Sequence, residues 1–465
     1  MFQAGTSVTV VSPPLGHPIA GLFHRREATT IRDDLVARTL VLADGAIQVA
    51  IVVCDLISLK ASFVHKVRML VHDSCGIPPQ NVFVSCTHTH SGPVTSPSRG
   101  EFPDPDYLEW LAVRIADGIR VAQTRLEPAR IAHGVAQVDG VCFNRRYRMR
   151  DGTIVFNPGP HNPDVVEPTG PIDPEVVTLL VESVDGAPLA LWSCLSTHYA
   201  GTDDELAISA DYYGDYARAV SRCLGEQCVG LHANGTSGNI NTIDPSEALG
   251  VSGNAKARLV GLAVAAAAIQ AVMTQARQSE GVALETISVP FIAKRWPVTL
   301  DDIQMARDLL AQPDRTEPLA AGSWSYLKGQ PIPAYQIAPY AQGLLEIAEM
   351  PETRETEIQF VRIGDFLIVG LPGEIFVEFG LTIKASSSFP STAVVGLAND
   401  IIGYIPTESA FDEGGYETWR SAGSWTARGT GEAMTQLVCE YLKTVEPPSR
   451  VNLCANLNER SGAGT

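Results

Sequence analysis

The sequence predicts an α/β fold built as one large domain. Short runs rich in Val, Ile and Leu alternate with longer stretches that suit helices, which is typical of sheets whose strands are buried. Hydrophobic residues make up 45% and charged residues 18% of the 465 residues, as in a packed globular enzyme rather than a disordered chain. We find neither an internal repeat nor a clear linker, so one large domain is preferred to two.

The elements follow from these patterns in chain order. Strands are predicted at the short apolar runs, which cover residues 48–54, 81–86, 176–182, 189–195, 228–233, 366–371 and 392–398. Helices are predicted at the longer stretches, which cover residues 63–73, 107–125, 213–224, 255–278, 300–310 and 431–442.

Two irregular regions interrupt this alternation. Residues 150–174 hold prolines at 158, 160, 163, 168, 171 and 174, which deny a regular ladder or helix and predict a long ordered loop or lid. Residues 313–339 read as a peripheral insertion. The domain is expected to span residues 1–455, and residues 456–465 form a polar tail.

The net charge and the cysteines limit the partners and the cellular compartment that we expect. A net charge of −18 repels phosphate backbones and anionic lipid, so nucleic acid is not an expected partner. The nine cysteines are an odd number, several lie inside apolar runs, and no two have a Cys-x-x-Cys spacing, so we expect free buried thiols in a reducing compartment. No signal peptide is recognised, and the apolar run 259–273 is shorter than the roughly 20 residues that span a bilayer. We therefore expect a cytoplasmic protein without a membrane span.

Residues of the types that bind metals follow four of the apolar runs. They are His88 and His90 in THTHSGP, His198 after LALWSCLST, Glu374 after FLIVGLPG and Tyr404 after VVGLANDIIG. In open α/β sheets, sites form outside the carboxyl ends of strands, so these side chains can converge there. If the first strand continues in extended form, His88 and His90 also share one face.

Each of these residues has an ordinary alternative role when it is taken alone. The Thr-His-Thr-His loop can satisfy its own backbone, and His198 can be a hydrogen-bonded core residue. Glu374 can sit at a helix N-terminus, and Tyr404 can pack beside neighbouring isoleucines. All ten histidines lie in the first half of the chain, so ligands from later strands must be carboxylate, phenolate or thiolate; zinc accepts two His plus one carboxylate.

A run of small polar residues, NGTSGNIN at 234–241, follows another predicted strand. Its backbone amides and Asn side chains suit an oxyanion or a polar substrate group. It lacks the Gly-Lys-Ser/Thr ending of a nucleotide-binding loop, and a tight turn without a ligand explains its spacing equally well.

Taken together, THTHSGP at 87–93, STH at 196–198, NGTSGNIN at 234–241, LPGE at 371–374 and NDIIGYIPT at 399–407 resemble the neutral/alkaline ceramidase family. The segment IRDDLVARTLVL at 31–42, with the following strand that ends in Cys54-Asp55-Leu56, looks like the opening of that catalytic domain. The resemblance covers roughly residues 5 to 445 in the right order. It implies mixed β-sheets flanked by helices.

The resemblance also implies a set of site residues. One zinc per chain would be held by His88, His198, Glu374 and Tyr404. His90 and the Arg of an Asn-Arg pair, Arg145 after Asn144, resemble groups that contact the scissile amide region.

The sequence departs from the family in three ways. Asn241 stands where characterised ceramidases carry a Ser at the reacting carbonyl, so a hydroxyl role does not transfer. We expect neither the additional C-terminal immunoglobulin-like domain of the family nor a secretion signal. The chain looks like a short bacterial-type relative whose substrate is a small soluble molecule rather than ceramide.

These features predict a zinc-dependent hydrolase that cleaves a linear amide (N-acyl) bond with water activated by the ion. His90 would stabilise the oxyanion or protonate the leaving nitrogen, Asn241 would add a neutral donor, and Arg145 would hold a substrate carboxylate unless it is an ordinary surface Arg. Asp211 is a candidate partner for the second ring nitrogen of a zinc-bound His.

Three alternatives to this function stay open. They are a two-metal barrel hydrolase, a zinc-dependent ester or lactone hydrolase, and a binding protein that holds metal without catalysis. The expected partner is a small-molecule amide substrate, and the sequence leaves a homo-oligomer open.

Overall fold

The computed structural model describes residues 1–445 except 46, 98–100, 248–249, 279–281, 321 and 323–329. Its centre is an eight-stranded mixed sheet with the order β14-β12-β11-β6-β1-β3-β4-β5. The strands are β1 (Gln3–Val10), β3 (Val36–Ala43), β4 (Gln48–Cys54), β5 (Val82–Cys86), β6 (Glu127–Gln137), β11 (Glu175–Ser183), β12 (Pro188–Leu195) and β14 (Val229–Asn234). The β4–β5 and β12–β14 pairs are parallel, whereas the other neighbours run antiparallel.

A second sheet packs against the first. It has four strands in the order β16 (Leu284–Lys294), β17 (Thr353–Ile363), β18 (Phe366–Gly370) and β20 (Ser391–Val395), and only the last pair is parallel. The apolar side chains between the two sheets form one continuous cluster, which includes the fully buried Trp192 and Phe366. Burying this layer removes apolar surface from water and fixes the sheets against each other.

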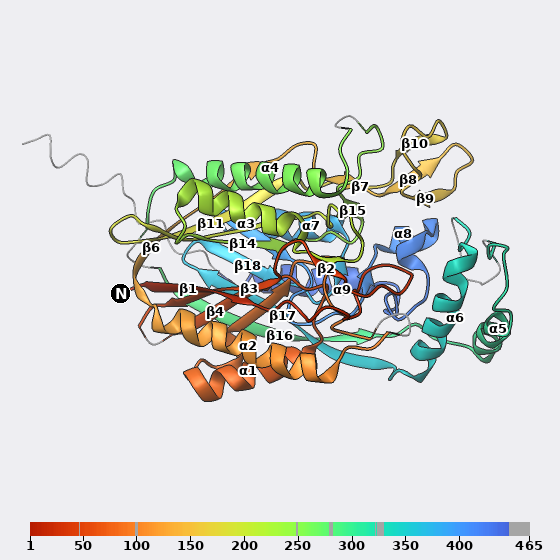
Figure 1. Ribbon diagram of the computed structural model, residues 1–465, viewed down its shortest axis with the longest axis horizontal. Helices are drawn as coiled ribbons and strands as arrows, with labels where there is room; N and C mark the ends of the chain where they lie inside the picture. Colours follow the sequence, from red (N-terminus) through yellow and green to blue (C-terminus); the bar gives the residue numbers. More distant parts are fainter. Residues whose placement is uncertain are drawn as a thin grey trace, which may run out of the picture.

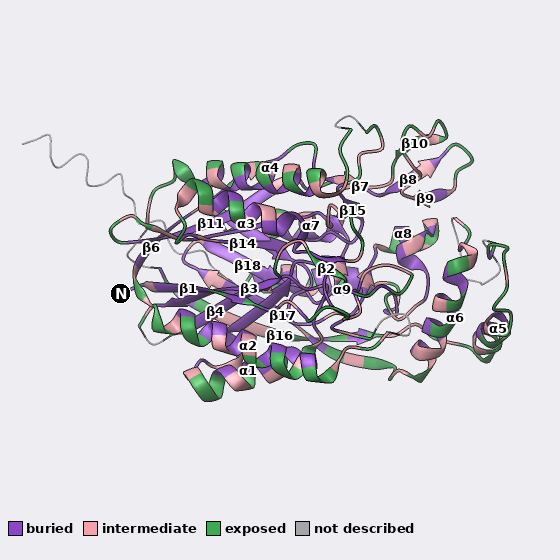
Figure 2. Ribbon diagram, in the orientation of Figure 1, coloured by how far each residue is buried: buried purple, intermediate pink, exposed green. Residues whose placement is uncertain are grey.

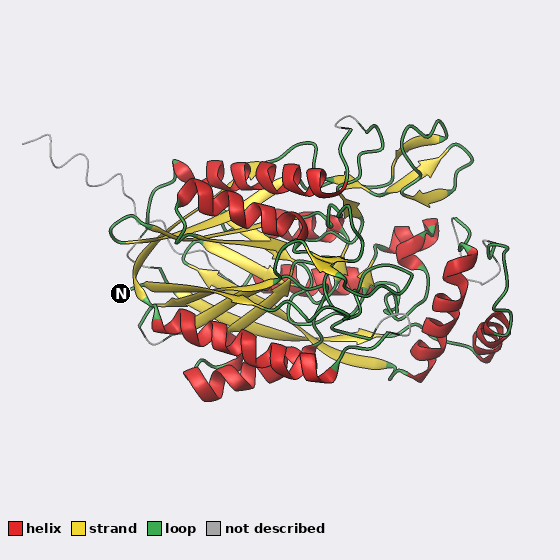
Figure 3. Cartoon of the chain, viewed as in Figure 1, coloured by secondary structure: helices red, strands yellow, loops and turns green. Residues whose placement is uncertain are grey.

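Helices cover both outer faces of the sheets (Figures 1 and 3). On the eight-stranded sheet, α1 (Ala61–Cys75) and α2 (Pro105–Thr124) lie on the side of β1 and β3, and α3 (Asp211–Leu224) and α4 (Gly253–Met273) lie on the side of β6, β11 and β14. The four-stranded sheet is covered by α7 (Val377–Ser386) and α9 (Thr430–Leu442). Figure 2 shows the resulting gradient, with buried strands in the middle and helices that are exposed on their outer sides. The α/β fold with mixed sheets flanked by helices, as predicted, is therefore confirmed.

Further helices, turns and short strand pairs complete the fold. The helices are α5 (Leu300–Leu310), α6 (Ala334–Glu349), α7 (Val377–Ser386), α8 (Glu408–Glu413) and α9 (Thr430–Leu442), and the 3-10 turns are η1 (Pro79–Asn81) and η2 (Tyr416–Thr418). Short strand pairs also form: β2 (Thr30–Ile31) with β13 (Ala207–Ile208), β7 (Phe143–Asn144) with β15 (Ile240–Asn241), and β19 (Glu374–Ile375) with β21 (Tyr404–Ile405). The α5–α6 pair lies at one end of the molecule (Figure 1), where part of the expected insertion 313–339 is found.

The expectation that residues 150–174 form no ladder is wrong. They contain β9 (Ile154–Phe156) and β10 (Val165–Pro168), which pair antiparallel on either side of β8 (Arg146–Met149). The ladder forms because three of the six prolines lie in the connection between β9 and β10 and two follow β10; the remaining one, Pro168, ends β10. The tail 456–465 lies outside the described residues.

The apolar run at 259–273 forms most of α4. Among the described residues, α4 is the one helix with the length and apolar composition that crossing a membrane requires, and 50% of its most apolar window is buried inside the protein. It packs against α3, β6 and β11 through residues such as Val260 and Val264.

The eight described cysteines are all free thiols. Five are buried, namely Cys54, Cys86, Cys142, Cys194 and Cys228, whereas Cys223 is exposed. Burial raises the pKa of the thiols, that of Cys142 and Cys194 to about 12, so these buried cysteines are inert core residues rather than nucleophiles.

Candidate metal centre

His88 and His90 lie in the loop that leaves β5. This strand pairs with β4 as far as Cys86 and Cys54, and the loop then follows the neighbouring chain, because His88 N donates to Leu56 O at 2.9 Å. His88 has φ = +66°, so the extended conformation does not continue past β5. The expectation that His88 and His90 share one face of an extended strand is therefore wrong. The two imidazoles still meet edge to face, with ring centroids 4.8 Å apart.

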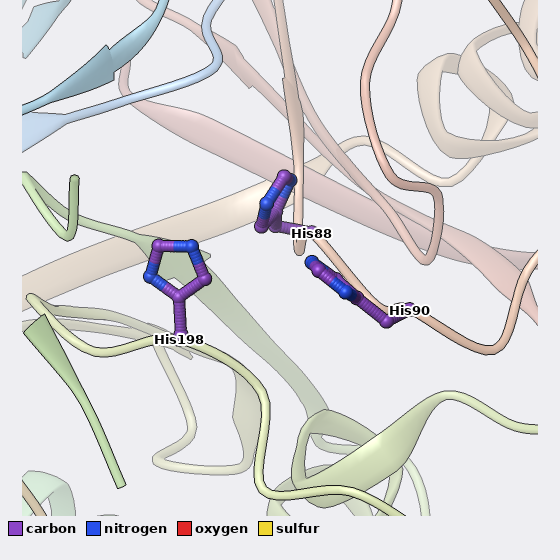
Figure 4. Close-up of side chains that lie close together, drawn as sticks. All are labelled: His88, His90 and His198. Atoms are coloured by element: carbon purple, nitrogen blue, oxygen red, sulfur yellow. The ribbon is translucent and has the colours of Figure 1, made fainter. Parts of the chain in front are cut away.

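His198 reaches the same place from the loop after β12. Its ring centroid lies 5.0 Å from that of His88 and 6.2 Å from that of His90. One ring nitrogen from each of the three histidines lies within 4.8 Å of the others, so this group could hold a metal ion. Figure 4 shows the three rings gathered around one space, two from one loop and the third from another.

Backbone carbonyls fix the tautomers of two of these histidines. His88 Nδ1 lies 2.8 Å from Ile57 O, and His198 Nδ1 lies 2.8 Å from Ile240 O. A carbonyl oxygen only accepts hydrogen bonds, so each Nδ1 carries a proton, and in the neutral form of each ring the lone pair is on Nε2. This arrangement, in which the second ring nitrogen donates to the protein, is typical of metal-binding histidines.

Glu374 completes a donor set with these two lone pairs. Its Oε2 lies 3.3 Å from His88 Nε2 and 3.2 Å from His198 Nε2. Ligand atoms on a tetrahedral zinc with bonds of about 2.0 to 2.1 Å lie about 3.3 to 3.4 Å apart, so Glu374 Oε2 lies close to the spacing of a shared zinc ion from both nitrogens. Two imidazole nitrogens and one carboxylate oxygen are also the donor types that zinc accepts.

The electrostatics of this group suit a cation. Burial alone would raise the pKa of the Glu374 carboxyl, but the imidazoles of His88 and His198 outweigh it and hold that pKa well below its usual range. Burial, followed by the charge of Arg145, lowers the pKa of His198 to about 4. At neutral pH the site therefore offers a carboxylate and a neutral imidazole, which are the ligand forms.

Tyr404 lies beside Glu374 because β19 and β21 pair in parallel with these two residues opposite each other. The Arg145 guanidinium hydrogen-bonds the Tyr404 phenol and lies 5.3 Å above its ring. Burial and the charge of Glu374 raise the pKa of Tyr404 well above its ordinary value, so the phenol is neutral in the metal-free protein. The structure therefore places this predicted ligand next to the Glu374 carboxylate.

Arg145 is not a surface residue, because its side chain is 4% exposed. Its Nε donates to Glu417 Oε1 at 2.8 Å, its Nη2 donates to Gly238 O at 2.6 Å, and its Nη1 lies 3.2 Å from His198 Nε2. The planar group also lies 5.1 Å from the Phe156 ring centroid. The charge of Arg145 is thus already paired inside the protein.

His90 lies beside the donor set with its ring stacked on Tyr199. The two ring centroids are 3.9 Å apart at an interplanar angle of 20°. Arg26 Nη2 donates to His90 O at 2.8 Å and fixes the backbone at this point. The stacking holds the imidazole on the open side of His88, where it lines the cavity described below.

The run 234–241 supports the site mainly through its backbone. A Cβ on Gly238 would lie 2.4 Å from Glu374 O, so only glycine lets this loop approach the strand that carries Glu374. Asn239 Oδ1 accepts from Val377 N at 2.9 Å at the start of α7, and Asn241 Nδ2 donates to Asn157 Oδ1 at 2.8 Å.

Asp211 does not contact a histidine ring, so that expectation is wrong. Its carboxylate accepts hydrogen bonds from Ala200 N at 2.9 Å and Gly201 N at 2.8 Å, and thereby shapes the loop that follows His198. The ring nitrogens are held by backbone carbonyls instead, which have no side-chain signature in the sequence.

A cavity of about 310 Å³ opens onto the site. Its lining includes His88, His90, Glu374 and Tyr404 at one end, and neither Arg145 nor Asn241 belongs to it. The sequence analysis missed two further residues here, Tyr199 and Glu417. Tyr199 is adjacent to His198 and could have been suspected, whereas nothing in the EGGYETW segment marks Glu417 as a buried partner of Arg145.

No model of a known protein family matches the chain, and no curated protein matches it. Solved structures do. The chain is similar to the neutral ceramidase from Pseudomonas aeruginosa, with a TM-score of 0.69 and 19% identity over 94% of this chain and 73% of that one. It is equally similar to a ceramidase complexed with C2, with a TM-score of 0.69, 19% identity and 94% and 74% coverage. The chain therefore has a neutral ceramidase-like fold.

Proposed function

We propose that this chain is a zinc-dependent hydrolase that cleaves a linear amide bond of a small soluble substrate. One observation carries the proposal: His88 and His198 each donate Nδ1–H to a backbone carbonyl and point Nε2 at the same oxygen of Glu374. Two neutral imidazoles and a carboxylate with this spacing fit one zinc ion per chain, with Tyr404 adjacent as a further ligand. The similarity to solved ceramidase structures supports a hydrolase that acts on an amide bond.

When bound, zinc polarises a carbonyl and lowers the pKa of a coordinated water to about 7. The residues around the site hold and orient the ligands. The carbonyls of Ile57 and Ile240 keep the two imidazoles in the required tautomer, and Gly238 keeps the Glu374 strand in place.

His90 is the residue that we assign to proton transfer. It lines the cavity next to His88, and its stacking on Tyr199 fixes the ring plane. Imidazole is the side chain that most often transfers protons in enzymes, so His90 can donate to the oxyanion or to the leaving nitrogen. A role of His90 as a third imidazole ligand is the alternative, and the metal content of a His90 variant separates the two.

Arg145 acts in this proposal as a positioning residue. It contacts both Tyr404 and His198 while Glu417 balances its charge, so it orients two of the four ligands. Asn241 does not line the cavity, and its side-chain amide donates to Asn157 Oδ1, so this proposal gives it the role of holding its loop rather than a contact with the substrate.

The size of the cavity supports a small substrate. About 310 Å³ lies at the lower end of small-molecule sites and is too little for a lipid with two long chains. The net charge of −18 also disfavours adsorption to anionic membranes.

The test removes the metal with a chelator and returns zinc, while cleavage of paired N-acyl amides and O-acyl esters is followed. We expect activity to disappear on chelation and to return when about one equivalent of zinc is added. The protein with zinc should cleave the amides faster than the zinc-free control does. Turnover that survives complete metal removal would contradict the proposal. Cleavage of the esters alone would identify the ester or lactone hydrolase instead.

A further inference from the structure

The cavity that reaches the metal centre carries charge at its other end. Lys60, Glu346 and Arg354 line it together with the apolar side chains of Met350 and Trp425. A pocket for a purely aliphatic chain would not bring three ionisable groups to its lining, because burying a charge without a partner is costly. The charged end is therefore a recognition element that needs a polar group on the substrate.

Arg354 is already paired at this end. Its Nη2 donates to the carboxylate of Asp400 and, at 3.1 Å, to Ile401 O, and its guanidinium lies 5.5 Å from the Trp425 ring centroid. Asp400 is 1% exposed. Besides Arg354, three donors reach its oxygens: Ala61 N at 2.9 Å, Ile401 N at 2.8 Å and Thr356 Oγ1 at 2.9 Å.

Lys60 is the cation that this network leaves over. Among the described residues, its ammonium group makes no hydrogen bond or ion pair, although its charge is felt by Asp400 and Glu346. Burial, followed by the charge of Arg354, lowers the pKa of Lys60, and neither Asp400 nor Glu346 forms an ion pair with its ammonium group. A carboxylate from outside would supply the direct partner that this ammonium group lacks.

Lys60 is also held at a short distance from the metal ligands. It lies three residues after Ile57, whose carbonyl binds His88 Nδ1, and three residues of chain span at most about 11 Å. Both ends of the cavity are thus fixed by one loop, between β4 and α1. A substrate that reaches both ends has its amide and its anionic group separated by a short linker.

We propose that Lys60 binds a carboxylate of the substrate, so that this chain acts on N-acylated amino acids or on half-amides of dicarboxylic acids. This inference rests on the proposed function and replaces Arg145, whose charge Glu417 already pairs, as the carboxylate-binding residue. Glu346 lines the same cavity and disfavours a second negative charge, which limits the substrate to a single carboxylate.

Titration calorimetry on protein freed of metal with a chelator tests the inference. Without the metal, the probe is not hydrolysed, and its carboxylate cannot bind directly to a metal ion. The probes are N-acetyl-γ-aminobutyrate, its isomer N-methylglutaramate with the amide reversed, and the neutral N-acetyl-γ-aminobutyramide. We expect at least one of the two anions to bind 10-fold or more tightly than the neutral amide. The anion that binds more tightly shows whether the carboxylate lies on the amine half or the acyl half.

Variants then assign the effect to one residue. Lys60→Met should abolish the preference for the anion, Lys60→Arg should retain it, and Glu346→Gln should bind the anion at least as tightly as the wild type. Lys66→Met is the matched control, since Lys66 lies on α1, the helix that begins directly after Lys60, is 38% exposed and pairs with Glu109. Equal binding of anions and neutral amide, or an unchanged preference in Lys60→Met, would overturn the inference, as would weaker binding in Glu346→Gln.

The two proposals fail in different ways. If the Lys60-dependent preference is present but no amide or ester is hydrolysed after zinc is returned, the proposed reaction is wrong and the anion site stands. If amides are hydrolysed at equal rates with and without a carboxylate, the reaction stands and the anion site is wrong.

Discussion

Replacing Glu417 with Gln should destabilise the protein more than any other single change at the rim of the site. The Glu417 side chain is 0% exposed and accepts from two guanidinium groups, at 2.8 Å from Arg145 and 3.0 Å from Arg146. Those two Arg side chains are 4% and 2% exposed, so neither can turn to water when its partner is lost. Breaking a buried pair from one side costs about 3 to 5 kcal/mol, because a buried charge is left uncompensated.

The expected change in melting temperature follows from the size of the chain. An unfolding entropy of about 2.1 cal/mol/K per residue gives about 1 kcal/mol/K for the whole chain, so the melting temperature should fall by about 3 to 5 °C. Glu413→Gln is the matched control, since Glu413 pairs with Arg146 and Arg148 but its side chain is 25% exposed, and it should cost about 1 °C or less. Scanning calorimetry of the metal-free proteins measures both; a Glu417→Gln loss no larger than that of Glu413→Gln would refute the reasoning.

Three further predictions concern single residues. Gly238→Ala should lower activity at least 10-fold and reduce metal affinity, because its Cβ would lie 2.4 Å from Glu374 O; unchanged kinetics and affinity would contradict the close approach. His90→Gln should lower kcat by about 10²- to 10⁴-fold while the bound metal stays, and loss of the metal would make His90 a ligand instead. Burial lowers the pKa of His232 to about 3. As the pH drops, the unfolded chain therefore takes up a proton at this residue near pH 6.5, before the folded protein does. The free energy of unfolding should fall between about pH 6.5 and pH 3, by about 2 kcal/mol at pH 5 relative to pH 8. Denaturant titrations at both pH values should show a smaller pH dependence in His232→Gln, and an equal one would reject this source.

The strands that the sequence predicted are those buried on both faces. Runs such as those of β4, β5 and β18 are continuously apolar because sheet or helix covers each side. The sequence analysis missed strands that carry polar residues. In β3, for example, Arg38 interrupts the apolar run, and only the fold reveals that the buried carboxylate of Asp55 pairs with it at 2.8 Å.

The proposed metal ligands were visible in the sequence because each follows a recognisable strand. His88, His198 and Glu374 come from strand ends that the fold brings to one place, which depends on strand order and not on loop detail. Contacts that depend on loop paths could not be predicted. The carbonyl of Ile57, the carboxylate of Glu417 and the unpaired ammonium of Lys60 acquire their roles only when loops from distant parts of the chain meet.

Metal content per chain tests the central claim most directly. Elemental analysis of the purified wild-type protein should find one equivalent of zinc, His88→Ala and Glu374→Gln should each retain less than about a tenth of it, and His232→Gln, altered at a buried histidine outside the centre, should retain it fully. Full zinc occupancy in His88→Ala and Glu374→Gln would show that the ion, if bound, is held elsewhere.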